Sequence, residues 1–386
     1  MRIPAASSGS ISAVLPAALS AVRGGSATPL SLPPDVSGVI VLVVDGLGRA
    51  LLDQHAALAP TLTGAPGPTL DATFPTTTPT NLTSLGTGTP PIEHGIIGTA
   101  CGVAGSDRPL ISLTWRWDSQ LHGPDARDDL PPEAYQPLTT VFSQALDHGI
   151  AATTVLEPSF AESGLTRAAL RGGSIVAASG LDATLAAAVE AVIPGPAIAY
   201  AHHGDIDTAG HRHGPGSQAW CVELARADAT LTRWREQLPP RVALVVIADH
   251  GMVEVPPQGL IDLAERPELL AGVRMLGGDP RARQLHVEPG ARDEVAATWR
   301  AHAGATGRVV TREQAISAGW FGPAVRQRAG IDARIGDLLV LADTEVAWIH
   351  GERDPFGGRM PGQHGALSDA ELLVPAVSLT SPGASS

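Results

Sequence analysis

The chain has 386 residues, of which 44% are hydrophobic, and it carries a formal net charge of −13 with a pI near 5.4. This length and composition suit one large α/β domain, or a large domain with a smaller one. The negative charge argues against a general affinity for nucleic-acid backbones or anionic membrane surfaces. The sequence contains no lysine, which excludes Schiff-base chemistry and phosphate-loop lysines.

Cysteine content and hydropathy limit the compartment. Cys101 and Cys221 are too few for a disulfide framework and too far apart for a thiolate metal motif. Ser12, Pro16 and Ser20 interrupt the apolar amino-terminal stretch, which is unfavourable for a secretory signal. No apolar run approaches the roughly 20 residues of a membrane helix. We expect a soluble protein without a membrane partner, cytoplasmic rather than secreted, and the sequence leaves its oligomeric state open.

Buried strands and helices alternate along the chain. Residues 10–23 read as a leading helix with Ser10 as its cap. Three apolar runs, 38–44, 197–201 and 242–247, are typical of central parallel strands covered on both faces. Alanine- and leucine-rich helical segments lie between them, at 181–192 and 217–237. The alternation predicts a doubly wound, mostly parallel α/β sheet.

The sequence pattern changes between residues 255 and 345. This stretch carries strand signals at 283–288 and 336–341 and a helix signal at 291–302, but no strand end rich in metal-type ligands. We interpret 255–345 as an inserted α+β cap subdomain. The catalytic core is then formed by residues 1–254 and 346–386.

Ligand-type side chains follow each of the three apolar runs. They are Asp45, then Asp207 with His211, then Asp249 with His250. In open α/β sheets ligands bind outside the carboxyl ends of the strands, so these side chains should converge. His364 lies between Gly362 and Gly365 in a glycine-rich segment, and such an isolated histidine suggests a functional role. Six such residues suit two three-ligand metal sites, although an Asp-His pair taken alone is more often a cap with a hydrogen-bonded histidine.

A helix amino terminus offers a site for phosphate beside these ligands. Thr78 reads as the N-cap of a helix, Pro79 suits its first position, and Gly86 and Gly88 end it. Free N–H groups and the helix dipole favour an anion there. Thr78 is therefore a candidate nucleophile, although a Thr-Pro opening is also a common helix start.

The motifs that carry these residues resemble the nucleotide pyrophosphatase and phosphodiesterase branch of the alkaline phosphatase superfamily. They occur in the family's order between about Val39 and His364: VVDG, TFPTTTPTNLTSLGTG with EHGI, DTAGHRHGP, ADHGM and GQHG. The resemblance implies that one zinc ion binds Asp207, His211 and His364. It implies that a second binds Asp45, Asp249 and His250 together with the Thr78 hydroxyl, and that Asn81 donates to the phosphate.

Two departures from the family pattern affect the substrate more than the metals. Family members commonly read Thr-Phe-Pro-Asn from the nucleophile onward, whereas this chain has Thr78-Pro79-Thr80-Asn81 and lacks the aromatic residue. The family's Glu-Pro-Asp is replaced by Asp205-Ile206-Asp207. The first change affects substrate stacking and the second affects the geometry of the ligand loop.

The resemblance implies a two-zinc phosphodiesterase or nucleotide pyrophosphatase that acts on a small phosphodiester or nucleotide through a phosphothreonine at Thr78. A phosphomonoesterase or phosphonate hydrolase with the same metal site is the first alternative, and a non-catalytic metal-binding protein is the second. Other polar and aromatic residues are expected to serve mainly outside the metal shell or in packing: His94, Trp115, Trp117, His202, His203, His213, Arg281 and Arg283.

Overall fold

The computed structural model describes residues 2–5, 7–118, 122–351, 354 and 359–382. Its larger sheet has seven strands in the order β2-β18-β9-β1-β8-β6-β7. The bounds of these strands are β1 Gly38–Val44, β2 Thr69–Asp71, β6 Ala151–Leu156, β7 Ser174–Ala177, β8 Ala197–His203, β9 Val242–Ile247 and β18 Leu373–Thr380. Strands β9, β1, β8, β6 and β7 run parallel, and β18 pairs antiparallel with β9 on one side and with the edge strand β2 on the other. The predicted doubly wound, mostly parallel sheet is confirmed.

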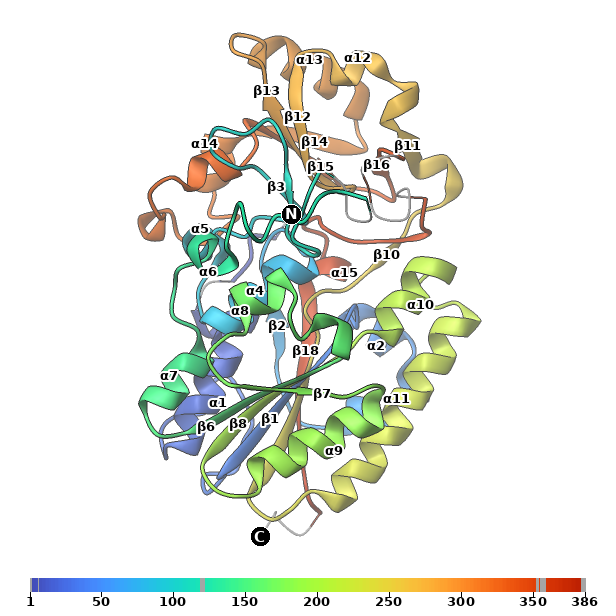
Figure 1. Ribbon diagram of the computed structural model, residues 1–386. Helices are drawn as coiled ribbons and strands as arrows, with labels where there is room; N and C mark the ends of the chain where they lie inside the picture. Colours follow the sequence, from blue (N-terminus) through green and yellow to red (C-terminus); the bar gives the residue numbers. More distant parts are fainter. Residues whose placement is uncertain (1, 6, 119–121, 352–353, 355–358, 383–386) are drawn as a thin grey trace.

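The three predicted strands form the centre of this sheet. Every residue of β1 and β9 is buried, as continuous β-branched runs require when helices cover both faces of a sheet. In Figure 1, α1 and α7 lie on one side of the sheet, and α9 and α11 lie on the other. The core helices are α1 Val14–Val22, α2 Arg49–Gln54, α3 Pro60–Gly64, α4 Thr78–Thr87, α5 Pro91–His94, α6 Pro132–Tyr135, α7 Val141–Asp147, α8 Gly164–Ala169, α9 Leu181–Val192, α10 Asp205–His213, α11 Gln218–Gln237 and α15 Asp369–Leu372.

Local capping explains where two of these helices begin. The Ser217 hydroxyl accepts from the backbone N–H of Trp220 and so fixes the first turn of α11, near the predicted start. At the amino terminus, Ser10 caps a short 3-10 helix, Ile11–Ala13, that leads into α1. The predicted single helix over 10–23 is therefore two consecutive helices.

A second seven-stranded sheet lies above the first in Figure 1, with α12 and α13 beside it. Its order is β14-β15-β13-β12-β3-β4-β5, and all its pairs are antiparallel. The strands and helices are β3 Ala100–Cys101, β4 Leu110–Ile111, β5 Arg116–Trp117, β12 Val273–Asp279, β13 Ala282–Val287, β14 Gly307–Thr311, β15 Leu338–Ala342, α12 Pro267–Leu270, α13 Arg292–Ala303 and α14 Arg312–Ser317. Segment 255–345 thus contributes β12 to β15, while β3 to β5 come from residues that precede it by more than a hundred positions.

Short two-stranded ladders connect the two parts of the molecule. Strands β10 Val253–Glu254 and β17 Gly362–Gln363 pair antiparallel, and β11 Leu260–Asp262 pairs parallel with β16 Ala347–Ile349. The remaining 3-10 helices in the described part of the chain are Ser7–Gly9, Ala56–Leu58, Pro158–Phe160, Pro257–Gly259, Leu263–Glu265, Ala324–Arg326 and Ile331–Arg334. No described helix combines the length and apolarity needed to cross a membrane.

A buried ion pair also joins the second sheet to the core. Arg281, beside β13, donates from Nε and Nη2 to both carboxylate oxygens of Glu371 in α15, at 2.8 and 3.0 Å. The side chains are 2% and 0% exposed. Glu371 also accepts from the backbone N–H of Ala366, two residues after His364, at 3.0 Å. The pair therefore ties the second sheet to the segment that carries a predicted metal ligand.

Glu371→Ala should lower the free energy of unfolding by about 3–5 kcal/mol, because it leaves the Arg281 guanidinium buried and unpaired. The matched control is Asp53→Ala, which breaks the exposed Arg49–Asp53 pair of α2 and should cost about 0–1 kcal/mol. Urea denaturation followed by circular dichroism measures both. Equal unfolding midpoints for the two variants would contradict a stabilising role for the Arg281–Glu371 pair.

Candidate metal and phosphate site

The predicted ligands meet at the carboxyl ends of three adjacent strands. Asp45 follows β1, Asp249 follows β9 by one residue, and Asp207 lies in the first turn of α10, directly after β8. Register pairs Val44 of β1 with His203 of β8, so these chain ends lie side by side. Gly46 has φ +71°, and a Cβ on it would lie 2.8 Å from Oδ1 of Asp207. The glycine after Asp45 therefore lets the second carboxylate approach.

Asp207, His211 and His364 form the first predicted ligand group. His211 Nε2 lies 3.5 Å from Asp207 Oδ1, as the i, i+4 spacing on α10 requires. The Nε2 atoms of His211 and His364 are 3.2 Å apart. Both Nδ1 atoms lie 2.8 Å from backbone carbonyl oxygens, of Gly362 and Thr76, and must donate to them because a carbonyl only accepts. In the neutral rings the two Nε2 lone pairs therefore face one another.

The second predicted group is centred on His250, but Asp249 is not part of the close cluster around it, in which Asp207 takes its place. His250 Nε2 lies 3.5 Å from Asp45 Oδ1 and 3.5 Å from Asp249 Oδ2, while its Nδ1 donates to the carbonyl oxygen of Gly251 at 3.0 Å. The ligand-type atoms of Asp45, Asp207 and His250 lie within 4.8 Å of one another, and so do those of Asp207, His211 and His364. Asp207 thus lies between the two groups, a position that the sequence did not predict.

Three buried carboxylate oxygens in this cluster have no hydrogen-bond donor: Asp45 Oδ1, Asp207 Oδ1 and Asp249 Oδ2. Burial, and then the charge of Asp45, raise the pKa of Asp249 to about 6 and raise the pKa of Asp207 well above its usual value. Burial lowers the pKa of His211 and His364, because it disfavours the charged imidazolium. Their Nε2 atoms therefore stay unprotonated. Unpaired buried anions facing imidazole lone pairs fit a bound divalent cation.

His202 is a site residue that the sequence analysis placed outside the metal shell without assigning it a partner. It is the last residue but one of β8, and its Nε2 donates to Asp45 Oδ2 at 3.0 Å. Burial opposes ionisation of Asp45, but the hydrogen bond and charge of His202 outweigh it and lower the pKa of that carboxyl. His202 therefore holds one oxygen of Asp45 and leaves the other directed at His250. The sequence signal was only its place at a strand end.

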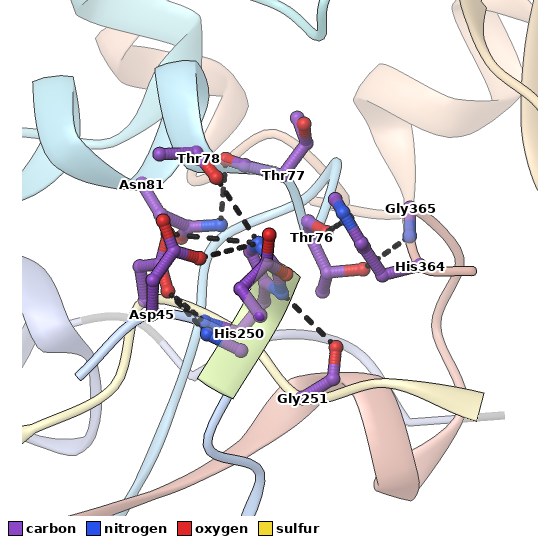
Figure 2. A network of polar contacts seen from close by, with 12 residues as sticks. Asp45, Thr76, Thr77, Thr78, Asn81, His250, Gly251, His364 and Gly365 are labelled. Atoms are coloured by element: carbon purple, nitrogen blue, oxygen red, sulfur yellow. Dashed lines mark hydrogen bonds and ion pairs between the residues drawn. The ribbon is translucent and has the colours of Figure 1, made fainter. Parts of the chain in front are cut away.

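Thr78 lies at the start of α4, with its hydroxyl in the ligand cluster. The N-cap is Thr77, whose backbone is extended, and Thr78 is the first residue of the helix. The helix therefore begins one residue earlier than predicted, because the sequence analysis took Thr78 as the N-cap. Thr78 Oγ1 is 3.2 Å from His250 Nε2, and Figure 2 shows it beside His250 and Asp45. Because His250 Nδ1 is the donor to Gly251, the unprotonated Nε2 accepts a hydrogen bond from the Thr78 hydroxyl.

The structure does not place Asn81 as a phosphate donor. Its side chain is 0% exposed. Its oxygen accepts from the N–H and hydroxyl of Thr73 at 2.6 and 2.7 Å, and its nitrogen donates to the carbonyl oxygens of Thr77 and Pro75 at 3.2 and 3.4 Å. Both ends of the amide are used within the protein, as Figure 2 shows for Thr77. This geometry argues against the predicted role and indicates that Asn81 holds the loop before Thr78.

Asn81→Ala should therefore destabilise the fold by about 1–3 kcal/mol, because it leaves buried donors of Thr73 without an acceptor. Thermal unfolding measures this effect. A phosphate donor would behave in the opposite way, with an unchanged melting temperature and a loss confined to phosphate binding. Thr232→Ala, which removes a hydroxyl at the half-exposed surface of α11, is the control.

A pocket opens beside Thr78 between the two sheets. Its lining includes Thr78, Asp207, His211 and His364 from the core, and Thr99 and Asp279 from the second sheet and its flanking loop. Trp115 and Trp117 are 0% and 7% exposed, so they pack in the interior and offer no stacking surface. Arg281 is held by Glu371, and Arg283 donates to Asp354 and the Trp348 carbonyl oxygen. Among the described lining residues none carries a positive charge.

This fold, with its ligand-rich strand ends below a second sheet, defines the class of α/β proteins of alkaline-phosphatase-like architecture. The sequence profile of the type I phosphodiesterase/nucleotide pyrophosphatase family matches residues 39–367. The chain belongs to this family, whose description names hydrolytic activity on phosphodiester and pyrophosphate bonds. A sequence search of curated proteins finds no significant match.

Solved structures share the fold at low sequence identity. Human ectonucleotide pyrophosphatase/phosphodiesterase 5 is 17% identical with a TM-score of 0.62, over 89% of this chain and 88% of that one. An inactive threonine-to-alanine variant of the murine protein, in complex with AMP, is 18% identical with a TM-score of 0.61 over the same shares. Phosphonoacetate hydrolase from Sinorhizobium meliloti, in complex with phosphonoacetate, is 20% identical with a TM-score of 0.64, over 89% of this chain and 90% of that one.

Proposed function

We propose that the protein is a two-metal phosphodiesterase or nucleotide pyrophosphatase in which Thr78 is the nucleophile. The observation that carries this proposal is the Thr78 hydroxyl, 3.2 Å from His250 Nε2 at the start of a helix. The family assignment supports a hydrolase of phosphodiester or pyrophosphate bonds. The inactive murine relative with a threonine replaced by alanine is consistent with a threonine nucleophile.

The ligand clusters support two divalent ions. Asp207, His211 and His364 would hold one, and Asp45, Asp249 and His250 would hold the other beside Thr78. Zinc fits this mixture of carboxylate oxygen and imidazole nitrogen, and each ring donates its other nitrogen to a backbone carbonyl, as metal-binding histidines do. When bound, such ions supply Lewis acidity that lowers the pKa of a hydroxyl and offsets charge on phosphoryl oxygens.

The chain's own groups account for the remaining steps. Thr78 Oγ1 releases its proton to solvent and forms a bond to phosphorus, while the bond from phosphorus to the leaving oxygen breaks and that oxygen takes up a proton from solvent, which produces a phosphothreonine. Because Pro79 has no N–H and the Asn81 N–H donates to Thr77, the N–H groups of Thr78 and Thr80 are those that the start of α4 would offer to phosphoryl oxygens. Water then attacks the phosphothreonine, and Thr78 regains its proton. His202 keeps Asp45 oriented throughout, through its 3.0 Å hydrogen bond.

The nearest alternative is a phosphomonoesterase or phosphonate hydrolase at the same site, and the likeness to phosphonoacetate hydrolase keeps it open. A monoester or a carboxylated phosphonate brings more negative charge than a diester. The described lining of the pocket carries Asp279 and Asp354 and no cationic side chain. This balance favours a diester with one negative charge.

Hydrolysis of bis(p-nitrophenyl) phosphate and p-nitrophenyl phosphate by zinc-loaded protein tests the proposal. We expect kcat/KM for the diester to exceed that for the monoester. A larger kcat/KM for the monoester would support the alternative. No hydrolysis of either substrate by protein with two ions bound would favour the non-catalytic metal-binding protein and overturn the proposal. Elemental analysis of the protein as purified identifies the ions, because Asp and His ligands also accept manganese and iron.

A further inference from the structure

Asp279 is a buried carboxylate in the pocket beside Thr78 for which the proposed reaction has no use. It ends β12 and is 4% exposed. Its Oδ2 accepts from the backbone N–H of Thr99 at 3.3 Å, and the Thr99 side chain also donates to the carboxylate. Neither ligand cluster of the described residues includes it. The carboxylate is therefore poised to accept a hydrogen bond inside the pocket.

The surrounding loops are shaped around this side chain. Gly98 has φ +117°, and a Cβ there would lie 3.0 Å from Asp279 Oδ2. The Thr99 hydroxyl in turn lies 3.0 Å from that of Thr77, the neighbour of the nucleophile. Thr99 therefore contacts both Asp279 and the residue that precedes α4. Because both Asp279 and Thr78 line the same pocket, a ligand bound at Thr78 has the carboxylate within its reach.

Asp279 also lacks a neutralising partner. No ion pair of Asp279 occurs among the described residues, and the guanidinium of nearby Arg283 is engaged by Asp354 and by the carbonyl oxygen of Trp348. Burial raises the pKa of Asp279 above its usual range. A buried carboxyl group without an ion-pair partner gains from a further donor that a ligand brings into the pocket, because its two oxygens can accept more bonds than Thr99 supplies.

We propose that Asp279 is a specificity-determining residue that accepts a hydrogen bond from a hydroxyl or ammonium group on the organic substituent of the phosphodiester. This inference rests on the proposed function, and it names the substrate class that the function leaves open. Asp279 selects alkyl phosphodiesters with a hydrogen-bond donor. The carboxylate disfavours substituents that end in a further phosphate or carboxylate, since like charges repel at short range.

Three synthetic diesters with the same p-nitrophenol leaving group test the assignment: the propyl, 3-hydroxypropyl and 3-aminopropyl esters of p-nitrophenyl phosphate. We expect wild-type kcat/KM to be about tenfold higher for at least one donor-bearing ester than for the propyl ester, as one hydrogen bond to a charged group can contribute. Whether the hydroxyl or the ammonium is favoured distinguishes a neutral substituent from a cationic one.

Asp279→Ala should reduce both preferences, measured as ratios to the propyl ester within the same variant, to about one. Asp279→Asn keeps an acceptor for Thr99 and should lose the preference for the ammonium selectively, because only the charge is removed. Asp293→Asn, on the exposed face of α13, is the matched control and should retain the wild-type ratios.

The outcomes separate the two proposals. Wild-type protein that hydrolyses all three esters with equal kcat/KM overturns the role of Asp279 and leaves the phosphodiesterase proposal standing. Wild-type ratios in both Asp279 variants have the same meaning. Wild-type protein that hydrolyses none of the esters overturns the phosphodiesterase proposal, and the Asp279 inference with it.

Discussion

Thr78→Ala should lower kcat for a phosphodiester at least about a thousandfold, while the protein keeps its fold and its bound ions. Loss of a covalent nucleophile removes a step for which binding alone does not compensate. The threonine is only half-buried and starts α4, and its hydroxyl makes one hydrogen bond, to His250. The six Asp and His ligands remain in place. Activity, metal content and melting temperature are to be measured on the same preparation.

Thr78→Ser is the matched variant, because it keeps the oxygen and removes only a methyl group. It should retain activity well above that of Thr78→Ala and form a phosphoserine that acid quenching and mass spectrometry detect. Wild-type turnover in Thr78→Ala would exclude the phosphothreonine route. Bound zinc with no turnover in wild type, Thr78→Ala and Thr78→Ser would instead favour a non-catalytic metal-binding protein.

The sheet and its ligands could be predicted because local pattern and position coincide. Strands β1 and β9 are unbroken apolar runs, and they match their predicted bounds of 38–44 and 242–247. Asp45 follows its run directly and Asp249 follows after one intervening residue, so the general rule for open α/β sheets brings them together without knowledge of loop conformation. The grouping of His211 with Asp207 required only the i, i+4 spacing of a helix.

Contacts between distant segments could not be predicted in this way. Strands β3, β4 and β5 contain two residues each and join a sheet whose other strands lie beyond residue 272. No periodicity exists over two residues, and pairing across such a separation depends on the tertiary fold. The division into core residues 1–254 and 346–386 and cap residues 255–345 remains a prediction based on the change in sequence pattern. Residues 100–117 contribute strands to the same sheet as β12 to β15 and so associate closely with them.

Side-chain roles could not be assigned from the sequence where a residue type permits several. The family resemblance implies that Asn81 donates to the phosphate, but in the structure its amide is bonded to Thr73 and Thr77 in the loop before Thr78. His202 and His203 are neighbours on β8, and strand alternation directs only one of them at Asp45. Sequence alone does not reveal which face of β8 looks toward the site.

His364→Ala tests whether the facing imidazoles bind a metal ion. In wild-type protein the Nε2 atoms of His364 and His211 lie 3.2 Å apart with their lone pairs opposed, an arrangement that a shared cation stabilises. Removal of one of three ligands should weaken the ion in the Asp207 group at least about a hundredfold, which is more than the effect of losing an outer partner. One of the two bound ions should be lost on dialysis, and diester turnover should fall with it.

The stability of the protein gives a second readout that does not depend on activity. An ion present at about a hundred times its dissociation constant stabilises the folded state by about 2.7 kcal/mol. Zinc should therefore raise the melting temperature of chelator-treated wild type more than that of chelator-treated His364→Ala. His148→Ala, at the exposed end of α7, should respond as wild type does. An equal zinc-induced shift in all three proteins would show that His364 is not a ligand, because each folded state would then gain the same binding free energy.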